Sequence, residues 1–274
     1  MTLPLSSSLP LHRETFGEGG SPVLLIHGFG TNGHTWNHWI PALSRRHRVV
    51  VVELKGFGDA PKPRDDAYGP EDQATLVHHL ILQENLRDLT LVGHSLGGTI
   101  ALLTALKLME DASPHLTRLV LLAGAAYPLP VSRYIRLAGT PFLGPLLLRL
   151  LPSRYVVRKA LELAYHDPDR VTQTRVEAYA EALRRPGGRH ALSRTARRIL
   201  PPDASRVTAR YPELDIPTLL VWGREDPIVP VQVGERLQDE LPRGRLEILE
   251  GCGHMPQEEE PGATLEMLLD FLAP

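Results

Sequence analysis

Short runs of mainly apolar residues recur along the chain, and turns that contain glycine or polar residues follow them. The runs cover residues 22–26, 48–52, 89–92, 119–123, 217–222 and 245–249. Runs of this length with few polar positions are typical of strands buried on both faces, as in a parallel sheet. Stretches with helical spacing separate them, at residues 36–43, 70–85, 99–109, 231–241 and 261–272. This alternation predicts an α/β protein with a mostly parallel, doubly wound sheet flanked by helices.

The alternation stops between residues 128 and 211, where no strand-like run occurs. This stretch contains apolar and basic segments broken by proline and glycine, at residues 129–151, 153–165, 169–184 and 191–200. Segments of this kind favour helices. We therefore predict an α/β core domain made of residues 1–127 and 212–274, with residues 128–211 inserted as a helical cap.

Composition narrows the class of protein. The chain has 274 residues, 42% hydrophobic and 23% charged, with a net charge of -2, which is typical of globular proteins and gives no reason to expect a nucleic-acid partner. Its single cysteine, Cys252, cannot form an internal disulfide. Residues 1–10 do not resemble a signal peptide, and no apolar run reaches the roughly 18 residues that span a bilayer. We expect a cytoplasmic protein without stable membrane insertion, and the sequence leaves the oligomeric state open.

The candidate nucleophile is Ser95, at the centre of a Gly-x-Ser-x-Gly motif formed by residues 93–97. The apolar run 89–92 precedes the motif and a helical pattern follows it, which predicts a strand, a sharp turn and a helix. Such a turn exposes the serine hydroxyl to a base and places its backbone at a helix N-terminus, where free N–H groups stabilise negative charge. The context therefore favours nucleophilic catalysis over a chance match.

The candidate acid and base follow two later strands. Asp226 comes after the run 217–222, and His254 comes after the run 245–249. The order serine, aspartate, histidine is the one that accompanies this motif in parallel sheets. His254 would take the proton from Ser95, and Asp226 would fix the imidazole tautomer. Glu225 is the alternative acid, and it fits less well because Asp226 directly precedes Pro227.

An acyl-transfer site also needs backbone donors for the negative oxygen that develops during attack. The N–H of Leu96, directly after the nucleophile, is one candidate. The N–H of Phe29, between Gly28 and Gly30 in the turn after the first apolar run, is the other.

Several motifs together resemble the α/β-hydrolase superfamily, in its cap-bearing serine hydrolase group of esterases, lipases, C–C bond hydrolases and cofactor-free haloperoxidases. They are His27-Gly28-Phe29-Gly30 with Trp36, Gly56-Phe57-Gly58, Gly93-His94-Ser95-Leu96-Gly97-Gly98, Trp222-Gly223-Arg224-Glu225-Asp226-Pro227 and Gly251-Cys252-Gly253-His254-Met255-Pro256. The resemblance implies a Ser95, Asp226, His254 triad, an oxyanion hole from Phe29 and Leu96, and no metal or organic cofactor.

Residues at several positions refine this resemblance. Where family members often carry Asp-x-Arg-Gly-x-Gly-x-Ser, this chain has glutamate at position 53 and Lys55 in place of the arginine, which bears on the subgroup and not on the triad. Relatives that open epoxides or remove halide carry aspartate at the nucleophile position, so serine at 95 disfavours those reactions. Cys252 is expected to be a small packed residue at its turn and not a second nucleophile.

The predicted cap is basic. It has sixteen Arg or Lys and six Asp or Glu, a surplus of +10 that leaves -12 on the remainder. The favoured interpretation is a solvated outer face with salt bridges to the acidic core. The alternative is that these arginines steer anionic substrates or a lipid surface toward the pocket.

These features predict hydrolysis of small-to-medium carboxylic esters, or related acyl substrates, through an acyl-enzyme intermediate. The leucine-rich stretch 142–151 is a candidate wall of the acyl pocket. Two alternatives stay open. One is C–C bond hydrolysis of vinylogous ketone acids of the meta-cleavage type, and the other is a non-turnover ligand receptor of the same fold.

Overall fold

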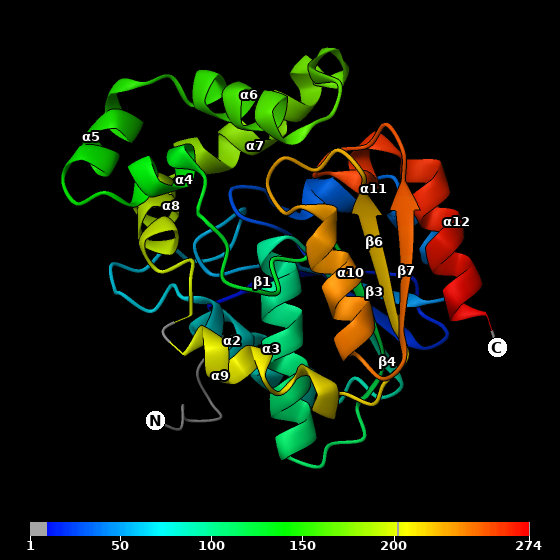
Figure 1. Ribbon diagram of the computed structural model, residues 1–274. Helices are drawn as coiled ribbons and strands as arrows, with labels where there is room; N and C mark the ends of the chain where they lie inside the picture. The colour runs from blue at the N-terminus through cyan, green and yellow to red at the C-terminus, as the bar shows by residue number, and fades with distance from the viewer. Residues whose placement is uncertain (1–9, 202, 274) are drawn as a thin grey trace.

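A seven-stranded sheet forms the centre of the computed structural model, which describes residues 10–201 and 203–273 (Figure 1). The strands are β1 (His12–Phe16), β2 (Pro22–Ile26), β3 (Arg48–Glu53), β4 (Leu89–His94), β5 (Leu116–Leu122), β6 (Thr218–Gly223) and β7 (Gly244–Leu249). Their order is β1-β3-β2-β4-β5-β6-β7, and β1 alone pairs antiparallel. The predicted mostly parallel α/β sheet is confirmed.

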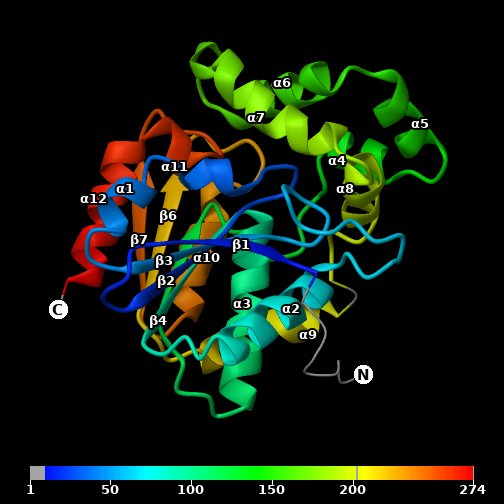
Figure 2. The same ribbon diagram turned by 180° about the vertical axis from the view of Figure 1, so that it is seen from behind.

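Helices cover both faces of this sheet (Figures 1 and 2). They are η1 (Gly33–Trp36), α1 (Ile40–Leu43), α2 (Pro70–Gln83), α3 (Leu96–Glu110), α10 (Val231–Glu240), α11 (Pro256–Glu259) and α12 (Pro261–Leu272). Alternate residues of β2 enter two different cores: Leu24 and Ile26 pack in the cluster that contains α2, α3 and α10. Val23 and Leu25 join the cluster with Trp36, α1 and α12 on the other face. Both faces are therefore dry, which explains why the strands lack alternating polar positions.

Two elements differ from the sequence-based expectations. Strand β1 was not predicted, because its sequence His-Arg-Glu-Thr-Phe is polar and three of its five residues are exposed at the sheet edge. The helix expected over 36–43 is instead the short η1, a turn and the short α1. Pro41 lies in the first turn of α1, where its missing N–H is tolerated, so a longer helix through it is disfavoured.

The chain between β5 and β6 is helical, as the absence of strand-like runs predicted. Its elements are α4 (Arg133–Gly139), α5 (Leu143–Leu150), α6 (Ser153–Ala164), η2 (Pro168–Arg170), α7 (Gln173–Arg184), α8 (Gly188–Arg197), α9 (Ala204–Thr208) and η3 (Tyr211–Glu213). Helices α4 to α8 lie beyond the ends to which β6 and β7 point (Figure 1). Among the described residues, no helix combines the length and apolarity needed to cross a membrane.

Ion pairs connect these helices to the acidic remainder of the chain. The pairs are Arg170–Glu260, Arg175–Glu258, Arg185–Asp59, Arg194–Asp66 and Arg210–Glu110. In all except Arg175–Glu258, both side chains are at least 29% exposed, so each of these pairs contributes at most about 1 kcal/mol. These contacts support the first interpretation of the basic surplus, in which most arginines lie in salt bridges and solvent.

The family-motif departure at Lys55 has a structural counterpart. The Lys55 side chain is 5% exposed, and its Nζ lies 2.7 Å from Asp65 Oδ1 and 2.9 Å from the carbonyl oxygen of Ala67. The same ammonium lies 4.7 Å from the centre of the Tyr68 ring. A single lysine thus connects the turn after β3 to the loop that leads into α2.

Candidate active site

Ser95 occupies a sharp turn between β4 and α3. Its φ of 52° and ψ of -117° are strained for a residue with a Cβ, and its N–H donates to the carbonyl of Leu122 at 2.9 Å. The flanking glycines make this turn possible. A Cβ on Gly93 would lie 2.2 Å from the Gly97 carbonyl oxygen, and one on Gly97 would lie 2.4 Å from that of Ile26. The spacing of the motif therefore follows from backbone contact on both sides of the serine.

We predict that Gly93→Ala lowers the free energy of unfolding by about 1–3 kcal/mol, because the new methyl group must displace backbone atoms. Gly262→Ala is the matched control: a Cβ there meets nothing within 4 Å, so the change should be neutral or stabilise α12 by up to about 1 kcal/mol. Urea unfolding of both variants measures the difference. Equal stability of the two variants would contradict this account of the turn.

The three predicted triad residues come together beyond the strand ends. His254 Nε2 lies 2.9 Å from Ser95 Oγ, and His254 Nδ1 lies 2.8 Å from Asp226 Oδ2. The other carboxylate oxygen of Asp226 accepts from the N–H groups of Ile228 and Val229, at 2.8 and 2.9 Å. All three functional side chains are largely buried. The imidazole is thus placed to accept a proton from the serine while the carboxylate fixes its orientation.

Glu225, the alternative acid, and Cys252, the possible second nucleophile, make contacts outside the triad. Glu225 accepts from the N–H of Cys252 at 3.1 Å and so supports the turn before His254. Cys252 is fully buried, and burial raises the pKa of its thiol well above the ordinary value. A thiol that stays protonated is a poor nucleophile, so its packing role agrees with the sequence-based expectation.

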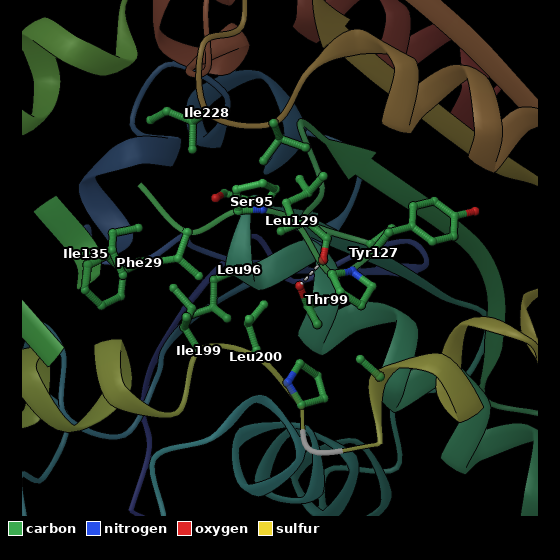
Figure 3. Close-up of a pocket in the computed structure, with 18 of the residues that line it drawn as sticks. Phe29, Ser95, Leu96, Thr99, Tyr127, Leu129, Ile135, Ile199, Leu200 and Ile228 are labelled. Carbon is green, nitrogen blue, oxygen red and sulfur yellow. Dashed lines mark hydrogen bonds between the residues drawn. The ribbon is translucent and has the colours of Figure 1, made fainter. Parts of the chain in front are cut away.

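The two predicted oxyanion donors lie beside the serine. Phe29, Ser95 and Leu96 line one cavity, and Figure 3 shows the three side by side. Within residues 10–201 and 203–273, the backbone N–H groups of Phe29 and Leu96 donate to no protein acceptor. Unpaired N–H groups of residues that line the cavity of the nucleophile are candidates to stabilise an oxygen that gains negative charge during a reaction.

Two buried histidines fix the turns around Ser95. His94 Nε2 donates to the carbonyl oxygen of His254 at 2.8 Å, which connects the nucleophile turn to the loop of the candidate base. His27 Nε2 accepts from the N–H of Leu54 at 3.2 Å. Burial, more than the nearby His254, lowers the pKa of His94 to about 3, and burial also lowers the pKa of His27.

The pKa of His94 predicts a loss of stability in acid. Its pKa of about 3 in the folded chain lies below the ordinary histidine value of 6.5. The unfolded chain therefore binds more protons, and stability falls as the pH drops from 6.5 toward 3. Between pH 7 and pH 5 the expected cost from this group is about 2 kcal/mol. Urea unfolding at both pH values should show that this part of the decrease is missing in His94→Gln. An identical decrease in the variant would refute the assignment.

Two chambers meet at Ser95. The smaller, about 90 Å³, extends past Thr99 to Tyr127 and Tyr211 and is lined mainly by apolar residues (Figure 3). The larger, about 470 Å³, lies between the core and helices α4 to α8, and His254 opens onto it. Of the described residues that line either chamber, Lys159 is the only lysine, arginine or carboxylate. The site is therefore suited to apolar, uncharged groups on both sides of the nucleophile.

Two buried carboxylates that the sequence analysis did not single out hold this arrangement together. Glu259 accepts from the N–H groups of Gly253 and Met255, at 3.1 and 3.0 Å, on either side of His254. It also accepts from the N–H of His166 at 2.8 Å. The N–H of His254 itself donates to the carbonyl of Ala164 at 2.7 Å. The loop of the candidate base is thus bonded directly to the end of α6.

Glu258 makes a second connection. Its side chain is 1% exposed and lies 2.7 Å from Nε of Arg175. It accepts from the hydroxyl of Thr35 at 2.5 Å, from that of Tyr165 at 2.7 Å, and from that of Tyr179. Burial, followed by the charge of Glu258, raises the pKa of Tyr165, so the phenol remains a donor. A run of three glutamates directly after the histidine loop was the available signal, because carboxylates are rarely buried without partners.

A mostly parallel sheet with a serine on a strand-to-helix turn and a histidine within hydrogen-bond distance is the architecture of an α/β hydrolase. The chain belongs to the alpha/beta hydrolase family, whose sequence model matches residues 23–267.

Several similar proteins are hydrolases, and two of those given below have a named activity. An uncharacterized hydrolase of Bacillus subtilis, YugF, is 28% identical, with 93% of this chain and 90% of the relative aligned. The 2-hydroxymuconate semialdehyde hydrolase of a Pseudomonas species is also 28% identical, over 93% of this chain and 87% of the relative. In solved structures, the meta-cleavage product hydrolase CumD of Pseudomonas fluorescens has a TM-score of 0.79 at 25% identity, covering 95% and 93% of the two chains.

Proposed function

We propose that this protein is a serine hydrolase that cleaves small-to-medium carboxylic esters through an acyl-enzyme intermediate. The observation that carries the proposal is the continuous contact from Asp226 through His254 to Ser95. His254 removes the proton as Ser95 Oγ attacks the ester carbonyl, and the N–H groups of Phe29 and Leu96 stabilise the tetrahedral oxyanion. His254 then gives its proton to the departing alcohol. A water molecule, activated by the same imidazole, releases the acid.

In this proposal residues 128–211 act as a cap over a core of residues 1–127 and 212–274. The cap supplies one wall of the larger chamber, including Leu147 and Leu148 of α5. An apolar acyl chain of medium length or an aromatic acyl group would be buried there. The contacts that Glu258 and Glu259 make with the residues directly after α6 and with α7 would keep that wall aligned with His254.

C–C bond hydrolysis is the second candidate. Two relatives with 28% identity are named 2-hydroxymuconate semialdehyde hydrolase and 2-hydroxy-6-oxo-2,4-heptadienoate hydrolase, and a similar solved structure at 25% identity is that of a meta-cleavage product hydrolase. Substrates of the vinylogous ketone acid type carry a carboxylate, which would need a cationic partner in the site. In the described part of the chain, Lys159 is the single lysine or arginine at the chamber wall. Its Nζ lies 2.6 Å from Glu162 Oε2, so it is already paired with a carboxylate. The lining therefore favours neutral esters.

A panel of p-nitrophenyl esters from acetate to palmitate, assayed beside a 2-hydroxy-6-oxo-dienoate, tests the choice. We expect the highest kcat/KM for acyl chains of medium length and at least tenfold lower values for palmitate and for the dienoate. Efficient dienoate turnover with slow ester turnover would replace the proposal with the second candidate. No turnover of any member, with retained binding, would favour a ligand receptor.

A further inference from the structure

Helix α5 exposes apolar side chains on its outer face. The exposed fractions are 92% for Phe142, 69% for Leu150, 51% for Leu146 and 44% for Leu143. Its inward side consists of the buried Gly144 and Leu148. Tyr134 and Leu137 of the neighbouring α4 are also exposed, by 44% and 42%. A surface helix normally presents polar residues to water, so a contiguous apolar face of this kind indicates a binding partner.

The charged residues beside this apolar face are all basic. No Asp or Glu occurs between Asp111 and Glu162. Arg133, Arg136 and Arg149 project from α4 and α5, all exposed, and in the described part of the chain none of the three is within salt-bridge distance of a carboxylate. Exposed leucine and phenylalanine flanked by arginine suit the boundary between lipid headgroups and acyl chains, where anionic lipids attract the basic groups.

A second copy of the chain is a poorer partner for the same face. A two-fold contact brings identical surface patches together, so Arg133, Arg136 and Arg149 of one copy would face the same arginines of the other. No acidic residue of α4 or α5 is present to compensate them. An anionic lipid surface supplies the missing negative charge.

The apolar face continues into the larger chamber. The chamber that reaches Ser95 is lined by Tyr134 and Leu137 of α4, by Leu147 and Leu151 in and directly after α5, and by Tyr155 of α6. Helix α5 itself lies at the outer edge of the group of helices in both views (Figures 1 and 2). A surface that contacted α4 and α5 would therefore lie beside a wall of the chamber.

We propose that the outer faces of α4 and α5 form a docking site for an anionic lipid surface. In the docked state Phe142, Leu146 and Leu150 enter the acyl boundary, and Arg133, Arg136 and Arg149 pair with headgroup phosphates. Binding of lipid is independent of the chemistry at Ser95. If the protein hydrolyses esters, as proposed above, docking would favour esters that partition into such a surface. This consequence rests on the proposed function.

Co-sedimentation of the full chain with vesicles tests the proposal. We expect binding to vesicles of equal parts phosphatidylglycerol and phosphatidylcholine, with at least tenfold weaker binding to pure phosphatidylcholine and at raised salt. The triple variant Phe142→Ser, Leu146→Ser and Leu150→Ser should lose at least tenfold in affinity, as should the variant with glutamine at the three arginines. Leu82→Ser is the matched control, because Leu82 is a similarly exposed leucine on α2, at 38%, and should leave binding unchanged.

Two further measurements separate the outcomes. None of the six substituted residues lines either chamber, so kcat/KM for a soluble ester should stay within about twofold in both variants, which shows that they are folded. A failure of ester turnover with intact vesicle binding would count against the proposed function alone. Wild-type binding that is weak, or insensitive to lipid charge and to both variants, would overturn the docking site. So would a concentration-dependent dimer in sedimentation velocity that the triple serine variant abolishes.

Discussion

Ser95→Ala is expected to lower kcat/KM for ester hydrolysis by at least about 10⁴-fold, because it removes the atom that attacks the carbonyl. Among the described serines and threonines that line the two chambers, Ser95 alone has a histidine within hydrogen-bond distance, with its Oγ 2.9 Å from His254 Nε2. The oxyanion donors and both chambers remain in the variant, so substrate binding should change little. Stopped assays with the best ester of the panel measure the loss, and titration with a non-hydrolysed analogue measures the binding.

Ser132→Ala provides the matched control for this experiment. Ser132 also lines both chambers, but its Oγ accepts from the N–H of Ile135 as the N-cap of α4. Covalent labelling by a fluorophosphonate should persist in Ser132→Ala and disappear in Ser95→Ala. If the Ser95→Ala variant is still labelled, or hydrolyses esters within tenfold of the wild-type rate, another group is the nucleophile.

Much of the fold follows from local patterns in the sequence. The six parallel strands β2 to β7 were predictable, because burial on both faces removes polar residues from the central strands. So was the mainly helical stretch between β5 and β6, whose described residues contain no strand. The edge strand β1 was not, since its ladder with β3 is made by backbone groups that any sequence can supply. The short helices near Trp36 were also missed as separate elements, because the apolar spacing there serves packing against the sheet and does not continue through Pro41.

The candidate triad was predictable for a different reason. Ser95, Asp226 and His254 each follow a strand of one parallel sheet, and the carboxyl ends of such strands share an edge. The roles of Glu258 and Glu259 could not be predicted in the same way. Their partners come from the turn directly after α6, from α7 and from η1. No local spacing specifies which part of an inserted segment will reach the histidine loop.

Asp226→Asn is expected to lower kcat for ester hydrolysis by about 10⁴-fold while leaving the fold intact. The amide is nearly isosteric, and its oxygen can still accept from the N–H groups of Ile228 and Val229. Its NH₂ group then faces His254 Nδ1 at the place of Oδ2. Because Nδ1 must accept this hydrogen bond, the proton moves to Nε2, and the nitrogen that faces Ser95 Oγ can no longer take a proton.

Glu225→Gln separates this effect from a general change of charge or turn geometry. The neighbouring carboxylate contacts the N–H of Cys252 and not the imidazole, and glutamine can accept the same bond, so kcat should fall by less than about tenfold. A loss confined to kcat in Asp226→Asn, with unchanged KM and an unchanged midpoint of thermal unfolding, would match a tautomer effect. A comparable loss of kcat in both variants would mean that Asp226 acts only by shaping the loop after β6. The direct contact between Asp226 and His254 would then not explain the activity.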